Sequence, residues 1–265
     1  MTEIITRGAA AAAGADQPGA DGAVEAALRV ELAAVFRLAA RNGWHEAVAN
    51  HFSAAVSADG RRFLVNPRWR HFETIRASEL LLVDADDPDV MSRPDAPDPS
   101  AWSIHRALHA TVPQARVALH VHPPYATALA CLQDPTLVPV DQNCARYFRR
   151  VVVDRAYGGL ADDPAEGERI AGLLGDGRTM LLGNHGVLVV APTVAEAYDD
   201  LYYLERACRV LVLAYSTGRE LRVLPDDVAE RTALGWAADT WAAFAHAHLA
   251  ESMALLDRTD PDFRL

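Results

Sequence analysis

Cysteine is scarce in this sequence, and the few present offer no ready cross-link. The 265 residues include three cysteines, Cys131, Cys144 and Cys208, an odd number with no CxxC pair. Disulfide-stabilised secreted domains and zinc knuckles use closely spaced and usually even sets. We therefore expect reduced thiols in the core of a cytoplasmic protein.

Long hydrophobic runs are also missing. No stretch of 18 or more apolar residues occurs, so the sequence predicts no membrane-spanning helix and no membrane partner. The alanine run at residues 9–13 is short and follows Glu3 rather than a basic segment, unlike a signal peptide. We interpret residues 1–22, rich in Ala, Gly and Asp, as a disordered N-terminal tail, and residues 23–265 as a single domain.

Positive charge is in deficit. The sequence has 25 basic against 36 acidic residues, a net charge of −11. A surface of that sign repels phosphate backbones, so nucleic acid is not expected as a partner. The same field opposes anionic substrates unless the site supplies its own cation. We therefore expect a small-molecule substrate held by a local metal ion or by arginines.

Helix-like and strand-like segments alternate along the chain. We predict strands at residues 51–57, 62–66, 80–83, 117–122, 151–153, 180–182 and 187–190. The first two flank Asp59-Gly60 and are expected to form a hairpin. Helices are predicted at residues 24–42, 98–111, 124–132, 141–148, 164–174, 193–215 and 225–256, with a polar tail from Asp257. This mixed order favours one α/β domain with three α/β/α layers.

Three histidines form the first candidate metal site. His120 and His122 are two residues apart in a predicted strand, which puts both side chains on one face. The similar pair His246 and His248 falls in a predicted helix, where such residues diverge by about 200°. His185 lies in a glycine-flanked turn, from which a side chain can project into a cleft. Three neutral imidazoles with an open position suit Zn²⁺, Mn²⁺, Fe²⁺ or Ni²⁺.

His105 and His109 form a competing pair. On a helix they share a face, as the histidines of the HExxH zinc motif do, but Arg106 stands where the catalytic glutamate belongs. This excludes the metalloprotease interpretation. We expect both side chains to pack in the core or to support the metal ligands.

Two segments of the sequence carry distinctive histidine motifs, residues 119–128 (LHVHPPYATA) and residues 182–187 (LGNHGV). They resemble the paired-histidine segment and the third-histidine turn of the class II aldolase/adducin family, and other segments resemble its adducin-like branch. Further similarities, spread between residues 24 and 262, are Asn66-Pro67 with His71-Phe72, residues 157–161 and residues 202–207.

The resemblance implies a fold, an assembly and a cofactor. The family has a central, largely antiparallel sheet between helical layers and usually forms tetramers with the site near a subunit interface. Its metal ligands correspond here to His120, His122 and His185. The implied ion is Zn²⁺ first, with Mn²⁺ or Fe²⁺ as alternatives, and in the aldolases it polarises a carbonyl group and stabilises an enediolate.

The sequence also departs from the sugar-phosphate aldolases of that family. Their glutamate before a tryptophan is replaced by Ala101 before Trp102. Their phosphate loop, Gly-Asn-x-Ser, reads Asn50-His51-Phe52-Ser53, and residues 141–143 offer no counterpart for their tyrosine. We therefore do not expect a sugar-phosphate aldolase.

A metal site without that glutamate favours a carbon–carbon lyase, either a decarboxylase or an aldolase, acting on a small unphosphorylated keto or hydroxy acid. Such a substrate carries a carboxylate, which a guanidinium group can bind through two hydrogen bonds. The candidate arginines are Arg68, Arg70 and Arg146.

Four further residues are predicted at the site. His51 and Tyr147 are candidate proton carriers. Asn66 and Ser100 are expected substrate contacts.

Two other functions remain open at this point. Residues 50–53 also resemble the corresponding segment of a few members of the family. Those members look like non-heme iron oxygenases from pathways that modify aromatic acids. The adducin branch includes cytoskeletal proteins that use this fold as a non-catalytic interaction module. Retention of all three histidines favours a metal site over that module.

Overall fold

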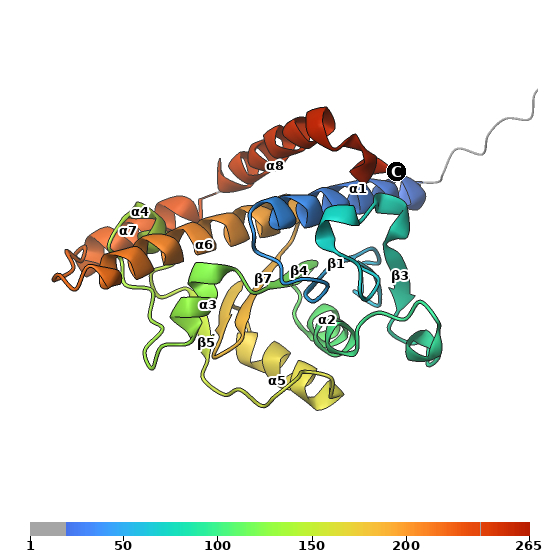
Figure 1. The fold of residues 1–265 in the computed structure, drawn as a ribbon, viewed down its shortest axis with the longest axis horizontal. Coiled ribbons are helices and arrows are strands. Elements are labelled where there is room, and N and C mark those ends of the chain that lie inside the picture. Colours follow the sequence, from blue (N-terminus) through green and yellow to red (C-terminus); the bar gives the residue numbers. More distant parts are fainter. Residues whose placement is uncertain (1–19, 239) are drawn as a thin grey trace, which may run out of the picture.

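The computed structural model describes residues 20–238 and 240–265, and its centre is a seven-stranded sheet (Figure 1). The strand order is β3-β2-β1-β4-β7-β6-β5, and every pair is antiparallel except β5 and β6. This confirms the predicted, largely antiparallel sheet. The strands are β1 (His51–Ala55), β2 (Arg62–Val65), β3 (Leu81–Asp84), β4 (Val117–Val121), β5 (Val151–Asp154), β6 (Thr179–Leu182) and β7 (Gly186–Ala191).

Helices cover both faces of the sheet and complete the predicted three layers. Helices α1 and α6 lie on one face, α2 and α5 lie on the other, and α8 packs on the outer side of α6 (Figure 1). None of the helices in the described ranges is long and apolar enough to cross a bilayer. The helices are α1 (Ala20–Arg41), α2 (Pro99–Thr111), α3 (Pro124–Ala130), α4 (Gln142–Arg146), α5 (Pro164–Leu174), α6 (Val194–Ser216), α7 (Asp226–Trp236) and α8 (Thr240–Thr259). Residues 1–19 of the predicted tail lie outside the described residues, and residues 20–22, also predicted as tail, belong instead to α1.

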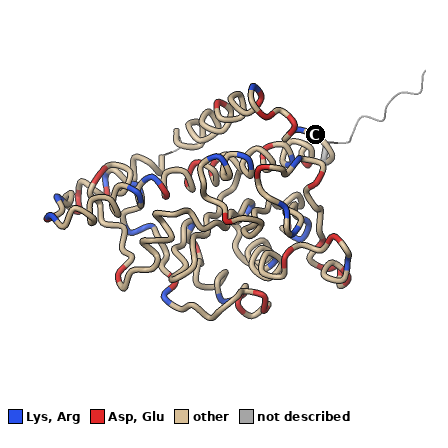
Figure 2. The backbone as a smooth tube through the Cα atoms, in the orientation of Figure 1, with Lys and Arg blue, Asp and Glu red and all other residues tan. Residues whose placement is uncertain are grey.

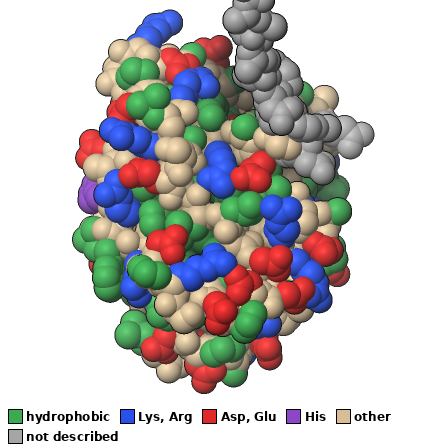
Figure 3. Space-filling view, turned by 90° about the vertical axis from the view of Figure 1, so that its right-hand side faces the viewer, with side chains coloured by type: hydrophobic (Ala, Val, Ile, Leu, Met, Phe, Trp, Pro, Cys, Tyr) green, Lys and Arg blue, Asp and Glu red, His purple; other side chains and the backbone are tan. Residues whose placement is uncertain are grey.

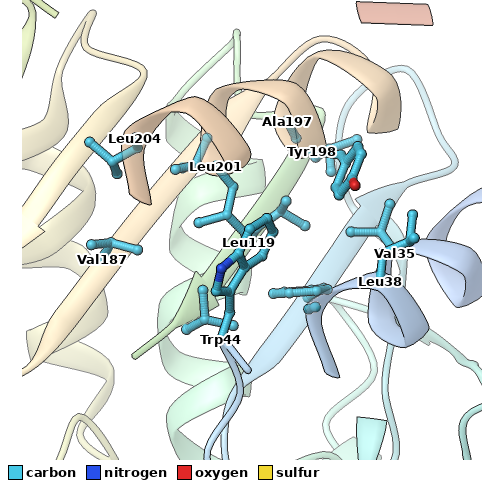
Figure 4. Close-up of a cluster of buried hydrophobic side chains, with 14 of the residues drawn as sticks. Val35, Leu38, Trp44, Leu119, Val187, Ala197, Tyr198, Leu201 and Leu204 are labelled. Atoms are coloured by element: carbon cyan, nitrogen blue, oxygen red, sulfur yellow. The ribbon is translucent and has the colours of Figure 1, made fainter. Parts of the chain in front are cut away.

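Strand β4 divides the core into two parts because its side chains alternate between the faces of the sheet. Leu119 points toward α1 and α6, where Figure 4 shows it among side chains such as Val35 and Leu201. Ala118 points toward α2 and α5. His120, two residues on, shares the α2 side with Ala118. The sequence pattern of β4 therefore places a buried histidine on the face that α2 covers.

The C-terminal part differs from the prediction of one helix over residues 225–256. The chain forms two helices, of which α7 ends at Trp236 and α8 begins at Thr240. Trp236 and Trp241, one on each side of this break, pack with ring centroids 4.6 Å apart. The guanidinium of Arg146 lies 5.5 Å from the ring of Trp236 and 3.9 Å from that of Trp241. This packing brings the two tryptophans together on Arg146.

The predicted polar tail from Asp257 is likewise wrong. Helix α8 continues to Thr259 and a 3₁₀ turn follows over Pro261–Arg264. Phe263 of this turn is fully buried, and Asp260 pairs with Arg37 of α1 at 3.0 Å. Apolar burial and ion pairs therefore hold this segment against α1.

The cysteines are free thiols, as expected. Cys144 and Cys208 are buried, but Cys131 is exposed. The core position predicted for Cys131 is wrong because this residue follows the last turn of α3 at the surface.

Candidate functional site

The structure brings His120, His122 and His185 together. His120 lies in β4, His122 follows the end of that strand, and His185 lies in the turn between β6 and β7. Because β4 pairs directly with β7, the turn that precedes β7 lies beside the end of β4. One ligand nitrogen of each imidazole lies within 4.8 Å of those of the other two.

Hydrogen bonds fix which nitrogen His120 and His122 each present. Nδ1 of His120 donates to the carbonyl oxygen of Val187 at 3.0 Å, and Nδ1 of His122 donates to Oε2 of Glu46 at 2.5 Å. Both Nε2 atoms then carry lone pairs, and they face each other at 3.3 Å. Nitrogens bound to one tetrahedral zinc ion at 2.0–2.1 Å are about 3.3–3.4 Å apart. The donor set therefore fits a divalent metal ion.

The protonation states agree with this fit. Burial, followed by the charges of neighbouring imidazoles, lowers the pKa of His120 well below its usual value. Burial and the nearby His122 lower the pKa of His185 to about 4. Both rings are therefore neutral near pH 7, which is the form that binds metal ions.

Glu46 also belongs to this cluster, although it was not predicted from the sequence. Its carboxylate reaches His122 from the loop after α1, across 76 positions in the sequence. Carboxylates commonly orient metal-bound imidazoles in this way. No periodicity or motif marks Glu46, because its role arises only when the loop folds against the end of β4.

A cavity of about 380 Å³ opens beside the three histidines. Four other residues predicted for the site line it, namely His51, Asn66, Arg68 and Ser100. Asn50 and Tyr157, which were not predicted as site residues, line it as well. The ring of Tyr157 lies 6.0 Å from that of His185.

Arg146, Tyr147 and Arg70 lie elsewhere. Arg146 forms buried ion pairs with Asp199 and Asp200, and the hydroxyl of Tyr147 donates to the carbonyl oxygen of Asp200 at 2.7 Å. Both side chains line a separate cavity of about 610 Å³. Arg70 is exposed and pairs with a glutamate at the protein surface. The structure therefore does not bring these three side chains to the histidine cavity.

Asn50 gives the loop before β1 a shape that glycine usually provides. Its φ of 74° lies in the left-handed region, which asparagine tolerates better than most residues. Its Oδ1 accepts a hydrogen bond from the amide of Glu46 at 2.8 Å. Its buried Nδ2 has no hydrogen-bond partner among the described residues. A buried donor without a partner beside a cavity suits an oxygen atom of a ligand.

Arg68 offers positive charge at the same cavity. Its guanidinium lies 4.5 Å from the centre of the Trp69 ring. Within residues 20–238 and 240–265, no carboxylate lies within ion-pair distance of it. Its donors are therefore available to an anionic group in the cavity.

His51 lies between the predicted metal ligands and α2. Its ring is 4.8 Å from that of His120, and its Nδ1 lies 2.7 Å from Nε2 of His105. Burial, with a further effect of His105, lowers the pKa of His51 well below its usual value. His105 and His109 are both buried on α2, which agrees with the expectation that they pack in the core or support the metal ligands.

Known proteins resemble the chain in sequence and in fold. Residues 30–212 match the family model described as Class II Aldolase and Adducin N-terminal domain. A crystal structure of an aldolase II superfamily protein from Pseudomonas syringae superposes with a TM-score of 0.82 at 32% identity, covering 91% of this chain and 96% of that one.

Two curated relatives extend this comparison. The "Putative aldolase class 2 protein" of Caulobacter vibrioides is 34% identical over 202 residues, which are 76% of this chain and 78% of that protein. Beta-adducin of Rattus norvegicus is 28% identical over 239 residues, which are 86% of this chain but 32% of that protein. With its sheet, its histidine cluster and these matches, the chain belongs to the class II aldolase/adducin family.

Proposed function

We propose that this protein is a metal-dependent carbon–carbon lyase, an aldolase or decarboxylase, acting on a small unphosphorylated hydroxy or keto acid. The observation that carries the proposal is the convergence of three imidazoles, two of them oriented by hydrogen bonds, on a cavity with an available arginine. A cavity of about 380 Å³ suits a small acid.

The ion would be held by His120, His122 and His185, with Zn²⁺ as the first choice and Mn²⁺ or Fe²⁺ as alternatives. When bound, it would polarise a carbonyl or hydroxyl oxygen and stabilise the negative charge that develops as the carbon–carbon bond breaks. We further propose a cytoplasmic homotetramer, in line with the free thiols and the family resemblance.

The protein side chains would bind and orient the substrate. Arg68 would pair with its carboxylate through two hydrogen bonds. Nδ2 of Asn50 would donate to a substrate oxygen, which would satisfy a buried donor. Asn66 and Ser100 line the same cavity, and we propose that they contact the substrate there.

The lack of lysine supports metal-assisted chemistry. All 25 basic residues of the sequence are arginines. Carbon–carbon cleavage through a Schiff base commonly uses a lysine amine that condenses with the substrate carbonyl. These 265 residues offer no such side-chain amine, so another group must activate the carbonyl of the substrate.

The test is the metal content of protein purified anaerobically, measured by mass spectrometry for the unaltered chain and for His120→Ala. The exposed His246→Ala serves as a matched control. We expect a metal close to one per chain in the unaltered protein and the control, and its loss in His120→Ala. Keto and hydroxy acids would then be screened for release of carbon dioxide or an aldehyde without oxygen consumption.

Other results would favour the alternatives. Bound iron together with oxygen uptake would favour a non-heme oxygenase. No metal in any of the three proteins, even after reconstitution, would contradict the proposal and favour an adducin-like interaction module.

A further inference from the structure

A continuous chain of buried hydrogen bonds runs from the cavity to the far end of α2. Nδ1 of His51 lies 2.7 Å from Nε2 of His105, and Nδ1 of His105 lies 2.5 Å from Oγ of Ser53. The same Oγ lies 2.7 Å from Nε2 of His109, and Nδ1 of His109 lies 2.7 Å from the carbonyl oxygen of Ala115. The side chains of the three histidines and the serine are all buried.

The carbonyl end gives this chain of hydrogen bonds a fixed direction. A carbonyl oxygen only accepts, so Nδ1 of His109 must carry the proton. Burial lowers the pKa of His109 to about 4, so this ring is neutral near pH 7 and its Nε2 accepts. The single hydroxyl proton of Ser53 is then donated to His109.

The direction carries through to the cavity. Because Oγ of Ser53 has already given its proton to His109, it accepts from Nδ1 of His105. The neutral ring of His105 therefore presents Nε2 as an acceptor. The group that faces this acceptor is Nδ1 of His51, which must therefore carry a proton.

We propose that Ser53, His105 and His109 are positioning residues, which hold His51 as its Nδ1–H tautomer with the lone pair of Nε2 exposed to the cavity. The neighbouring Ser100 does not use up this lone pair. Its Oγ lies 3.2 Å from Nε2 of His51 but 2.6 Å from Oδ1 of Asp98, to which it donates.

This tautomer has a consequence for the substrate, which rests on the lyase function proposed above. The lone pair at Nε2 accepts a hydrogen bond from a hydroxyl group, whereas a carbonyl or carboxylate oxygen would face it with a second lone pair. The substrate group beside His51 is therefore a hydroxyl, and the substrate class is a hydroxyl-bearing acid. In a retro-aldol cleavage the hydroxyl proton would pass to Nε2 of His51 as the carbonyl of the departing fragment forms, while the electron pair of the broken carbon–carbon bond would stay on the other fragment as an enolate.

The direct test is the tautomer of His51, read from the ¹⁵N shifts of its ring nitrogens by NMR in metal-free and zinc-loaded protein. The proposal requires a proton on Nδ1. A neutral ring with the proton on Nε2 would overturn it. This measurement on the unaltered protein needs neither a known substrate nor a variant that folds.

Two substitutions of His109 distinguish its effect on the direction of the hydrogen bonds from its effect on the packing of the core. In His109→Leu the hydroxyl of Ser53 loses its acceptor and can donate to His105, which reverses the chain and moves the His51 proton to Nε2. In His109→Gln the amide can still donate to Ala115 and accept from Ser53, so Nδ1–H should persist. A folded His109→Leu protein with an unchanged tautomer would contradict the proposal.

Once a substrate is known, His109→Leu should lower kcat by about 10²-fold with little change in KM. His109→Gln should recover most of the loss, which a purely structural role for His109 would not require. A correct tautomer in a protein without lyase activity would count against the proposed function alone. An active lyase with the Nε2–H tautomer would count against the positioning role alone.

Discussion

At the scale of single residues, Glu46 orients a predicted metal ligand from a distant part of the sequence. Its carboxylate accepts a hydrogen bond from Nδ1 of His122, which leaves Nε2 available for the proposed ion. We predict that Glu46→Ala lowers metal affinity by about 10- to 100-fold, the usual effect of removing such a partner. Competition with a chromophoric chelator would measure it.

The control for Glu46→Ala is Glu220→Ala, which makes the same change of charge at an exposed residue in the segment after α6. Equal affinities in the two variants would contradict the prediction, because the hydrogen bond from His122 to Glu46 would then contribute nothing to metal binding.

His109 predicts a dependence of stability on pH. Its pKa is about 4 in the folded chain and about 6.5 when unfolded. As the pH falls, His109 therefore takes up a proton in the unfolded chain before it does so in the folded chain. The stability that its neutral ring contributes above pH 6.5 is lost between pH 6.5 and 4. The loss from this residue is about 3 kcal/mol.

Urea unfolding of metal-free protein at pH 7 and pH 4 would measure this effect. The non-titrating His109→Gln should show a smaller loss between the two values. The same loss in both proteins would contradict a neutral, buried His109.

The histidine cluster could be predicted from the sequence, but the contact of Glu46 with His122 and the position of Arg146 could not. Alternation along a strand predicted that His120 and His122 would converge, even though His122 lies one residue past β4. The position of Arg146 could not be foreseen, because its partners Asp199 and Asp200 lie 53 and 54 positions away. Side chains that depend on distant partners leave no local pattern.

At the scale of elements, the start of β7 lies directly against a predicted metal ligand. A Cβ added at Gly186 would lie 2.4 Å from Cδ2 of His122 and 2.7 Å from the carbonyl oxygen of Val121. We predict that Gly186→Ala displaces the His122 ring and lowers metal affinity, although Gly186 offers no side chain to a metal. The chelator competition described for Glu46 would detect this.

Gly172 in α5 provides a matched control, since nothing lies within 4 Å of a Cβ added there. Gly172→Ala should leave metal affinity unchanged and add up to about 1 kcal/mol of stability, because alanine favours a helix over glycine. Metal affinity equal in Gly186→Ala and Gly172→Ala would show that β7 can shift without moving His122.

The 3₁₀ turn at the C-terminal end of the described chain is predicted to stabilise α1. Phe263 is fully buried in the main core cluster, whereas Leu265 is 64% exposed. Phe263→Ala should lower the free energy of unfolding by about 3–5 kcal/mol, and Leu265→Ala should have little effect. Chemical unfolding of both variants tests this, and similar losses would mean that the turn does not dock as described.

The elements were mostly predictable where local signals mark their ends. Asp98 caps α2 and Thr193 caps α6, as their positions in the sequence predicted. The break between α7 and α8 was missed because the segment is rich in alanine and has no proline, although Gly235 and Asp239 lie beside it in the sequence. It depends on the packing of two tryptophans against a distant arginine, which only the folded chain shows.

At the scale of the whole molecule, the negative charge is spread rather than gathered. Acidic and basic residues lie mainly on the helices and loops around the sheet (Figure 2). They are interspersed over the face shown in Figure 3. The net charge of −11 therefore acts as a diffuse field, against which Arg68 and a bound cation would attract an anionic substrate locally.

Exposed apolar side chains near the cavity predict an assembly. Leu160 and Tyr157 line the cavity and are 83% and 53% exposed, and Trp69, next to Arg68, is 68% exposed. Contact with a neighbouring subunit would cover them. We predict a tetramer by light scattering, and Leu160→Asp should weaken it if this surface is buried. A monomer at micromolar concentration would contradict the prediction.

The histidine cluster also has a consequence for the topology of the chain. The loop of Glu46, the end of β4 and the turn before β7 are far apart in sequence and meet at this cluster. An ion bound by His122 and His185 would close a loop of roughly 60 residues, and closing such a loop removes conformational freedom from the unfolded chain. Metal binding would therefore act as a reversible cross-link, slowing amide hydrogen exchange in three separate segments at once.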